Sequence, residues 1–150
     1  MSESSVPKQP KINRAVIDIG TNSTRMLIFR RDKKGQLFRV NKSVRYTRMG
    51  QGVNKTKRLH SDAIKRNIEA LEEYKSIAED YEVKEMFIFG TSALRDAENS
   101  SEFIDMAEQK LGMKVEIISV KKRRNMALSA YHNVLMRGCL FLTLAVEALN

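Results

Sequence analysis

The chain has 150 residues, of which 42% are apolar and 30% charged, with a formal net charge of +9. These values predict one soluble globular domain. The single cysteine, Cys139, excludes an intrachain disulfide, and no apolar run approaches the ~20 residues of a membrane-spanning helix. We therefore expect a cytoplasmic protein with no membrane association.

Residues 1–13 are polar and contain both prolines. We expect them to form a disordered lead-in, and they lack the apolar core of a signal peptide. The domain itself is predicted over residues 14–119.

The first predicted elements are two strands of a β-hairpin. The apolar runs Ala15–Ile19 and Met26–Phe29 leave only Gly20–Arg25 between them, which is enough for a tight turn. Asp18 then lies at the end of the first strand.

This turn is dense in groups that bind phosphate. Gly20 lets the backbone approach a ligand, and Arg25 adds a charged fork. Hydroxyl and amide groups come from the residues between them, namely Thr21, Asn22, Ser23 and Thr24. A carboxylate beside a phosphate loop usually needs a metal, so Asp18 indicates Mg²⁺. The alternative is a solvated hairpin tip whose polar side chains make only turn hydrogen bonds.

A charged turn at Arg30–Gly35 and a third strand at about Leu37–Tyr46 follow. Residues 47–60 are rich in glycine and basic residues without periodicity, which predicts a surface loop. Arg48 in this loop is a candidate anion contact, with a solvated loop arginine as the alternative. His60 has no partner at metal-ligand spacing, so we expect no metal or catalytic role for it.

A helix is predicted from Ser61 or Asp62, because apolar residues recur on one helical face. They are Ile64, Ile68, Leu71, Tyr74 or Lys75, Ala78 and Tyr81. The apolar run Glu85–Gly90 predicts an interior strand reached by a helical crossover. A second helix, beginning at Ser100 or Ser101 and ending at Leu111, precedes a last strand at Lys114–Ile118.

The segment T-S-A-L-R-D-A-E-N, Thr91–Asn99, follows the interior strand directly. Thr91, Ser92 and Arg95 would form a second cluster of phosphate donors at the carboxyl end of the sheet, where ligands of α/β sheets collect. The alternative is that Thr91 or Ser92 caps a short helix and that Arg95 pairs with a neighbouring carboxylate.

Three stretches carry a family resemblance: D-I-G-T-N-S-T-R at Asp18–Arg25, R-M-G-Q-G at Arg48–Gly52, and T-S-A-L-R-D-A-E-N at Thr91–Asn99. With the predicted order of a three-strand meander followed by helix-strand-helix-strand, they resemble the amino-terminal domain of the exopolyphosphatase and guanosine pentaphosphate phosphatase (Ppx/GppA) family. The resemblance implies an α/β fold of the actin-like ATPase (ribonuclease H-like) type, incomplete in this chain.

The resemblance also implies a phosphohydrolase that removes terminal phosphates from polyphosphate or guanosine pentaphosphate with Mg²⁺ and water. It assigns Asp18 to the metal, Gly20–Ser23 with Arg25 to a first phosphate loop, and Thr91, Ser92 and Arg95 to a second phosphate contact. It further implies a homodimer for an intact family member and no specific nucleic-acid partner.

The chain departs from the family pattern after Ser119. The family normally reads I-S-G-x-E-E-A there, with the second glutamate as catalytic base, and D-x-G-G-G-S-T-E further on. Here Ile117, Ile118 and Ser119 are followed by V-K-K-R-R-N-M, so the base position falls at Arg123. An arginine stays protonated at ordinary pH and cannot serve as a base, so we expect no catalytic residue to be retained.

A shifted reading frame accounts for this departure. Back-translation of residues 120–126 one base out of register permits G-E-E-E-A-E-Y, and the same operation on residues 138–150 permits V-L-I-F-D-V-G-G-G-S-T-E. We therefore expect residues 120–150 to be an out-of-frame tail, unlike the family. The alternative is a divergent basic extension with a helix at 125–136, a strand at 139–146 and a nucleic-acid-binding K-K-R-R run.

Three functions remain open from the sequence. The first is part of a phosphohydrolase, inactive here for want of the base and the second phosphate loop. The second is a half-module that binds Mg²⁺ and a phosphate chain without turnover. The third is a non-functional truncation product.

Overall fold

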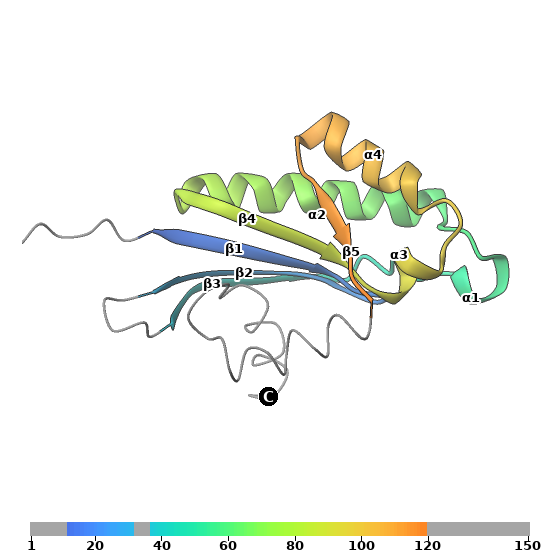
Figure 1. Ribbon diagram of the computed structural model, residues 1–150, viewed down its shortest axis with the longest axis horizontal. Helices are drawn as coiled ribbons and strands as arrows, with labels where there is room; N and C mark the ends of the chain where they lie inside the picture. The colour runs from blue at the N-terminus through green and yellow to red at the C-terminus, as the bar shows by residue number, and fades with distance from the viewer. Residues whose placement is uncertain (1–11, 32–36, 120–150) are drawn as a thin grey trace, which may run out of the picture.

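The computed structural model describes residues 12–31 and 37–119, which form a five-stranded sheet with helices on one face (Figure 1). The elements in chain order are β1 (Asn13–Ile19), β2 (Thr24–Arg31), β3 (Leu37–Arg45), α1 (Val53–Thr56), α2 (Ser61–Asp80), β4 (Val83–Gly90), α3 (Ser92–Asp96), α4 (Ser100–Leu111) and β5 (Val115–Ile117).

The sheet order is β3-β2-β1-β4-β5. β2 pairs antiparallel with both β1 and β3, whereas β1, β4 and β5 run parallel to one another. The predicted meander followed by two helical crossovers is therefore confirmed. Because β1 and β4 are parallel neighbours, their carboxyl ends lie at the same edge, where Ile19 pairs with Gly90.

The central strand β1 is buried on both faces of the sheet. Ala15, Ile17 and Ile19 belong to the main core with the residues of α2 and α4, while Val16 belongs to a smaller cluster with Leu27, Phe89 and Ile118 on the opposite face. Burial on both faces explains why this strand reads as a continuous apolar run without alternation.

Helix α2 begins at Ser61, with His60 as its N-cap: Nδ1 of His60 accepts a hydrogen bond from the backbone N–H of Asp62 at 3.3 Å. His60 therefore has a structural role. The predicted apolar face is buried from Ile64 to Ala78. Placing Tyr81 on that face was wrong: the helix ends at Asp80, and Tyr81 is 37% exposed.

Other boundaries also differ from the sequence-based expectations. The segment 47–60 is not entirely loop, because α1 forms a single helical turn within it. β1 begins at Asn13, inside the predicted lead-in, where the Asn13 side-chain amide donates to the carbonyl of Tyr81 at 2.7 Å. β2 extends to Arg31, so Arg30 and Arg31 do not belong to the turn predicted at Arg30–Gly35. The rest of that turn, the expected disorder of residues 1–11 and the tail 120–150 lie outside the described residues. None of the helices within 12–31 and 37–119 is long and apolar enough to span a bilayer.

Tyr74 ties α2 to the start of β2. Its side chain is fully buried, and its hydroxyl donates to the backbone carbonyl of Thr24 at 2.7 Å. Burial raises the pKa of Tyr74 from 10.0 to about 12, because the phenolate would lose its hydration.

The raised pKa of Tyr74 predicts a loss of stability in alkaline solution. A pKa that is higher in the folded than in the unfolded chain favours the neutral phenol on folding, so this contribution is complete below pH 10 and declines between pH 10 and about 12. The free energy of unfolding, from urea titrations at several pH values, should fall across this window by at most about 3 kcal/mol from Tyr74. The free energy of unfolding of Tyr74→Phe should fall less steeply over the same window. Equal slopes for the two proteins would contradict the raised pKa of Tyr74.

Candidate functional site

The loop between β1 and β2 is a tight turn in which Thr21 and Asn22 are exposed, whereas Ser23 is buried at 8% exposure. The N–H of Gly20 donates to the carbonyl of Ser23 at 3.0 Å, and a Cβ on Gly20 would lie 2.9 Å from that oxygen. Glycine is therefore needed for the close approach. Nε of Arg25 donates to the hydroxyl of Ser23 at 3.2 Å. We call Gly20–Ser23 the first loop.

The segment after β4 lies directly against the first loop. The hydroxyls of Thr21 and Ser92 are 3.0 Å apart and share a hydrogen bond. Both the backbone N–H and the hydroxyl of Thr91 donate to the carbonyl of Ile19, at 3.3 and 3.4 Å. The two hydroxyl clusters that were expected at the carboxyl edge of the sheet thus form one continuous polar surface.

The glycine-rich segment Arg48–Gly52 contacts the first loop from its other side. The N–H groups of Arg48 and Gly50 donate to the carbonyls of Asn22 and Thr21, at 3.0 and 2.9 Å. A Cβ on Gly50 would lie 2.3 Å from Cγ2 of Thr21, so the segment approaches as closely as glycine allows. The three sequence stretches singled out above therefore converge on Thr21.

Asp18 lies at the base of this surface and is 6% exposed. It pairs with Arg25 across the β1–β2 ladder, which puts the two side chains side by side on one face of the sheet. Within the described residues no three His, Cys, Asp or Glu side chains form a group able to hold a metal. Mg²⁺, however, is commonly bound by one or two carboxylates together with substrate phosphates. Asp18 therefore fits a Mg²⁺ ion that arrives with a phosphate chain, and does not fit a closed protein cage.

Arg95 pairs with a neighbouring carboxylate, which was the alternative to a phosphate contact. Its Nε lies 3.0 Å from Oδ1 of Asp96, in a partly exposed ion pair at the end of α3. Thr91 occupies the N-cap position of α3, yet its hydroxyl bonds to Ile19 and does not cap the helix. A contact between Arg95 and phosphate stays a prediction.

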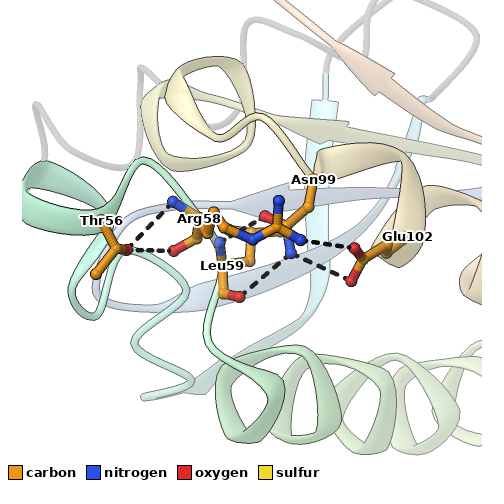
Figure 2. Close-up of polar contacts among 5 residues, drawn as sticks. All are labelled: Thr56, Arg58, Leu59, Asn99 and Glu102. Atoms are coloured by element: carbon orange, nitrogen blue, oxygen red, sulfur yellow. Dashed lines mark hydrogen bonds and ion pairs between the residues drawn. The ribbon is translucent and has the colours of Figure 1, made fainter.

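Asn99 anchors the far end of the Thr91–Asn99 segment, as Figure 2 shows. Its side-chain oxygen accepts from the N–H of Leu59 at 2.7 Å, and its Nδ2 donates to the carbonyl of Leu59 at 3.3 Å. Nδ2 also donates to Glu102, whose other oxygen accepts from Arg58, each at 3.2 Å. The buried amide thus joins this segment to the loop before α2.

The hydroxyl of Thr24 was expected to face a ligand, and this was wrong: the side chain is 0% exposed. It belongs to a second group of buried polar residues, which the sequence reasoning missed. Thr24 and Thr47 share a hydroxyl hydrogen bond of 2.9 Å, and Thr24 also donates to Oδ1 of Asn67 at 2.7 Å. All three side chains are buried. The available signal was Asn67 itself, a polar residue three positions after Ile64 on the apolar face of α2.

The chain matches known proteins over most of its length. The sequence profile of the Ppx/GppA phosphatase family matches residues 27–137. Exopolyphosphatase 2 of Mycobacterium tuberculosis is 37% identical over 101 residues, and the guanosine-5'-triphosphate,3'-diphosphate pyrophosphatase of Vibrio cholerae is 34% identical over 105. The crystal structure of the Aquifex aeolicus member of the Ppx/GppA family superimposes with a TM-score of 0.75 at 33% identity, covering 81% of this chain.

These matches cover only part of each relative. The chain spans 32% of the Mycobacterium protein, 21% of the Vibrio protein and 40% of the Aquifex chain. The alignments to the Mycobacterium and Vibrio proteins cover 65% and 70% of the present chain. The expected actin-like ATPase fold is confirmed by the structural neighbours. The profile match extends to residue 137, so a family boundary at residue 119 stays a prediction. The family resemblance itself is confirmed: the chain belongs to the Ppx/GppA phosphatase family.

Proposed function

We propose that this chain is the amino-terminal part of a phosphohydrolase that acts on the terminal phosphates of inorganic polyphosphate or guanosine pentaphosphate. The observation that carries the proposal is the hydrogen bond between Thr21 and Ser92, which joins two hydroxyl-bearing loops into one surface at the carboxyl edge of parallel strands. Such an edge is where α/β sheets bind anionic ligands. The names of the relatives, exopolyphosphatase and guanosine-5'-triphosphate,3'-diphosphate pyrophosphatase, support this substrate class.

The polar groups of this surface suit a chain of phosphates. Thr21, Ser23 and Ser92 supply hydroxyls, and Arg25 supplies a cationic fork held in place by its bond to Ser23. Phosphate groups carry several acceptor oxygens and no donors at full ionisation, so a donor-rich loop is the matching chemistry. A solvated hairpin tip, the alternative, does not explain why three separate segments converge on Thr21.

Asp18 is the proposed magnesium ligand of this surface. Bound Mg²⁺ would neutralise phosphate charge and polarise the bond to be cleaved. Asp18 would hold one side of the ion, and the phosphate chain and water would supply its other oxygens. Arg25 beside Asp18 keeps the local charge balanced when the ion is absent.

Turnover needs a group that orients or deprotonates the attacking water. The family base position falls at Arg123, which lies outside the described residues and carries a fixed positive charge. We therefore propose that these 150 residues bind a phosphate chain and Mg²⁺ without hydrolysing it. A chain with neither binding nor turnover is the remaining alternative.

A binding and turnover assay separates the three functions. Calorimetric titration with tripolyphosphate in the presence of Mg²⁺ should give a saturable heat, whereas Mg²⁺ alone should not, because Asp18 needs the phosphate oxygens to complete the ion's coordination. Phosphate release from polyphosphate should stay at the uncatalysed rate. Measurable phosphate release would show that catalysis does not need a base at the position of Arg123. If neither binding heat nor phosphate release is detected, the chain is a non-functional fragment.

Gly50 provides a local test of the first loop. Gly50→Ala should push Thr21 out of place, because the added methyl meets Cγ2 of Thr21 at 2.3 Å. The affinity for tripolyphosphate should fall about tenfold, the equivalent of a packing penalty of ~1–3 kcal/mol. Gly52→Ala is the matched control: it lies two residues away, its Cβ meets nothing within 4 Å, and it carries only the strain of its positive φ of 77°. Equal losses in both variants would point to general destabilisation.

The origin of the tail is tested on the gene. We propose that the loss of one base near the codon for Ser119 shifted the reading frame. The nucleotide sequence should then encode, one base out of register, the stretch G-E-E-E-A-E-Y over codons 120–126. A gene that encodes no family motif in either other frame would instead establish residues 120–150 as a divergent extension.

A further inference from the structure

Four buried polar side chains lie between α2, the start of β2 and the segment that follows β3. They are Thr24, Thr47, Asn67 and Tyr74, exposed by 0%, 2%, 0% and 0%. We call them the buried polar cluster. Burying a hydroxyl or amide is costly unless it is hydrogen-bonded, and each of the four has a partner within the cluster or on adjacent backbone.

The directions of these hydrogen bonds can be assigned. Nδ2 of Asn67 donates to the carbonyl of Ala63 at 2.8 Å, so its Oδ1 faces Thr24 as an acceptor. The single hydroxyl proton of Thr24 therefore goes to Oδ1 of Asn67, at 2.7 Å. It follows that Thr47 donates to Thr24 across their 2.9 Å contact. Tyr74 donates to the backbone carbonyl of Thr24, so Thr24 is fixed at both its side chain and its backbone.

The cluster adjoins the first loop along both of its flanks. Thr24 follows Ser23 in the chain, and Thr47 precedes Arg48, whose N–H binds the carbonyl of Asn22. Arg66 reinforces the second flank: its Nε donates to the carbonyl of Thr47 at 3.0 Å, and its Nη2 donates to Gln51 at 2.7 Å. Helix α2 thus holds two of the three segments that converge on Thr21.

We propose that Thr24 and Asn67 are positioning residues for the first loop: their buried hydrogen bond sets the place of Gly20–Ser23 relative to Ser92 and thereby the affinity of this surface for phosphate chains. The proposal rests on the proposed function for its ligand. Both side chains are 0% exposed, so we expect neither to touch the ligand. An apolar pair of side chains would fill the same space. A hydrogen bond is directional, so it also fixes the orientation of Thr24, and with it the first loop, relative to α2.

A matched pair of variants isolates the hydroxyl of Thr24. Thr24→Val keeps the shape and removes the donor, leaving Oδ1 of Asn67 and the hydroxyl of Thr47 without this partner, whereas Thr24→Ser keeps the donor. In the ligand-free 150-residue chain, amide hydrogen exchange at Arg48 and Gly50 reports how firmly the segment 48–52 grips the first loop. Phe103→Leu, a fully buried substitution on α4, serves as the control for a general loss of stability.

Thr24→Val should speed amide exchange at Arg48 and Gly50, and the increase should be at least about fivefold larger than the increase caused by Phe103→Leu. One ordinary hydrogen bond is worth about this factor. The dissociation constant of Thr24→Val for tripolyphosphate with Mg²⁺ should rise by a similar factor, while Thr24→Ser should stay within about twofold of the parent. If Thr24→Val does not fold, Asn67→Leu, which removes the acceptor of the same hydrogen bond, replaces it in the same comparison.

The two readouts separate this proposal from the proposed function. Exchange at Arg48 and Gly50 that matches Phe103→Leu would overturn the positioning role, whatever the ligand affinity. Faster exchange at these amides with unchanged tripolyphosphate affinity would also overturn it, because the loop would then move without consequence for binding. If the parent chain does not bind tripolyphosphate at all, the proposed function fails and the link from Thr24 to phosphate affinity fails with it, while the exchange data still decide whether the cluster orders the loop.

Discussion

The parallel pairing of β1 with β4 is the constraint on which the site depends. In this register Ile19 lies opposite Gly90, so both strands end together and their following segments emerge at the same edge. Thr91 then bonds to the carbonyl of Ile19, and the hydroxyl of Ser92 meets that of Thr21. Thr21 and Ser92 are 71 residues apart in the chain, and they meet because one backbone ladder aligns the strands that precede them.

Helix α2 makes hydrogen bonds to the segments beside this surface. The helix covers the sheet with an apolar face that includes Asn67 and Tyr74, and these two residues and Arg66 reach the backbone or hydroxyls near the strand ends. Loops that bind anions need fixed donors, since an ordered site pays less entropy when the ligand arrives. The same helix therefore contributes buried apolar residues to the core and, in our proposal, the hydrogen bonds that order the first loop.

Much of this architecture follows from local patterns in the sequence. The apolar run at β1, the 3.6-residue period of α2 and the glycine and hydroxyl residues after β1 and β4 each predicted an element or a loop correctly. The contacts that join the loops did not follow, because the bond from Gly50 to Thr21 and the bond from Thr24 to Asn67 link residues far apart in the chain. Tyr81 was misplaced because a helical period does not tell where a helix stops.

The central claim is that the first loop and the Thr91–Ser92 segment together hold a phosphate chain. An NMR titration of the ¹⁵N-labelled chain with tripolyphosphate and Mg²⁺ tests it most directly, because every backbone amide reports its own surroundings. The account predicts saturable shifts at Gly20–Ser23 and at Thr91 and Ser92, two segments that only the fold brings together. Shifts confined to the basic run at residues 121–124 would contradict it and would show that the anion binds by charge alone.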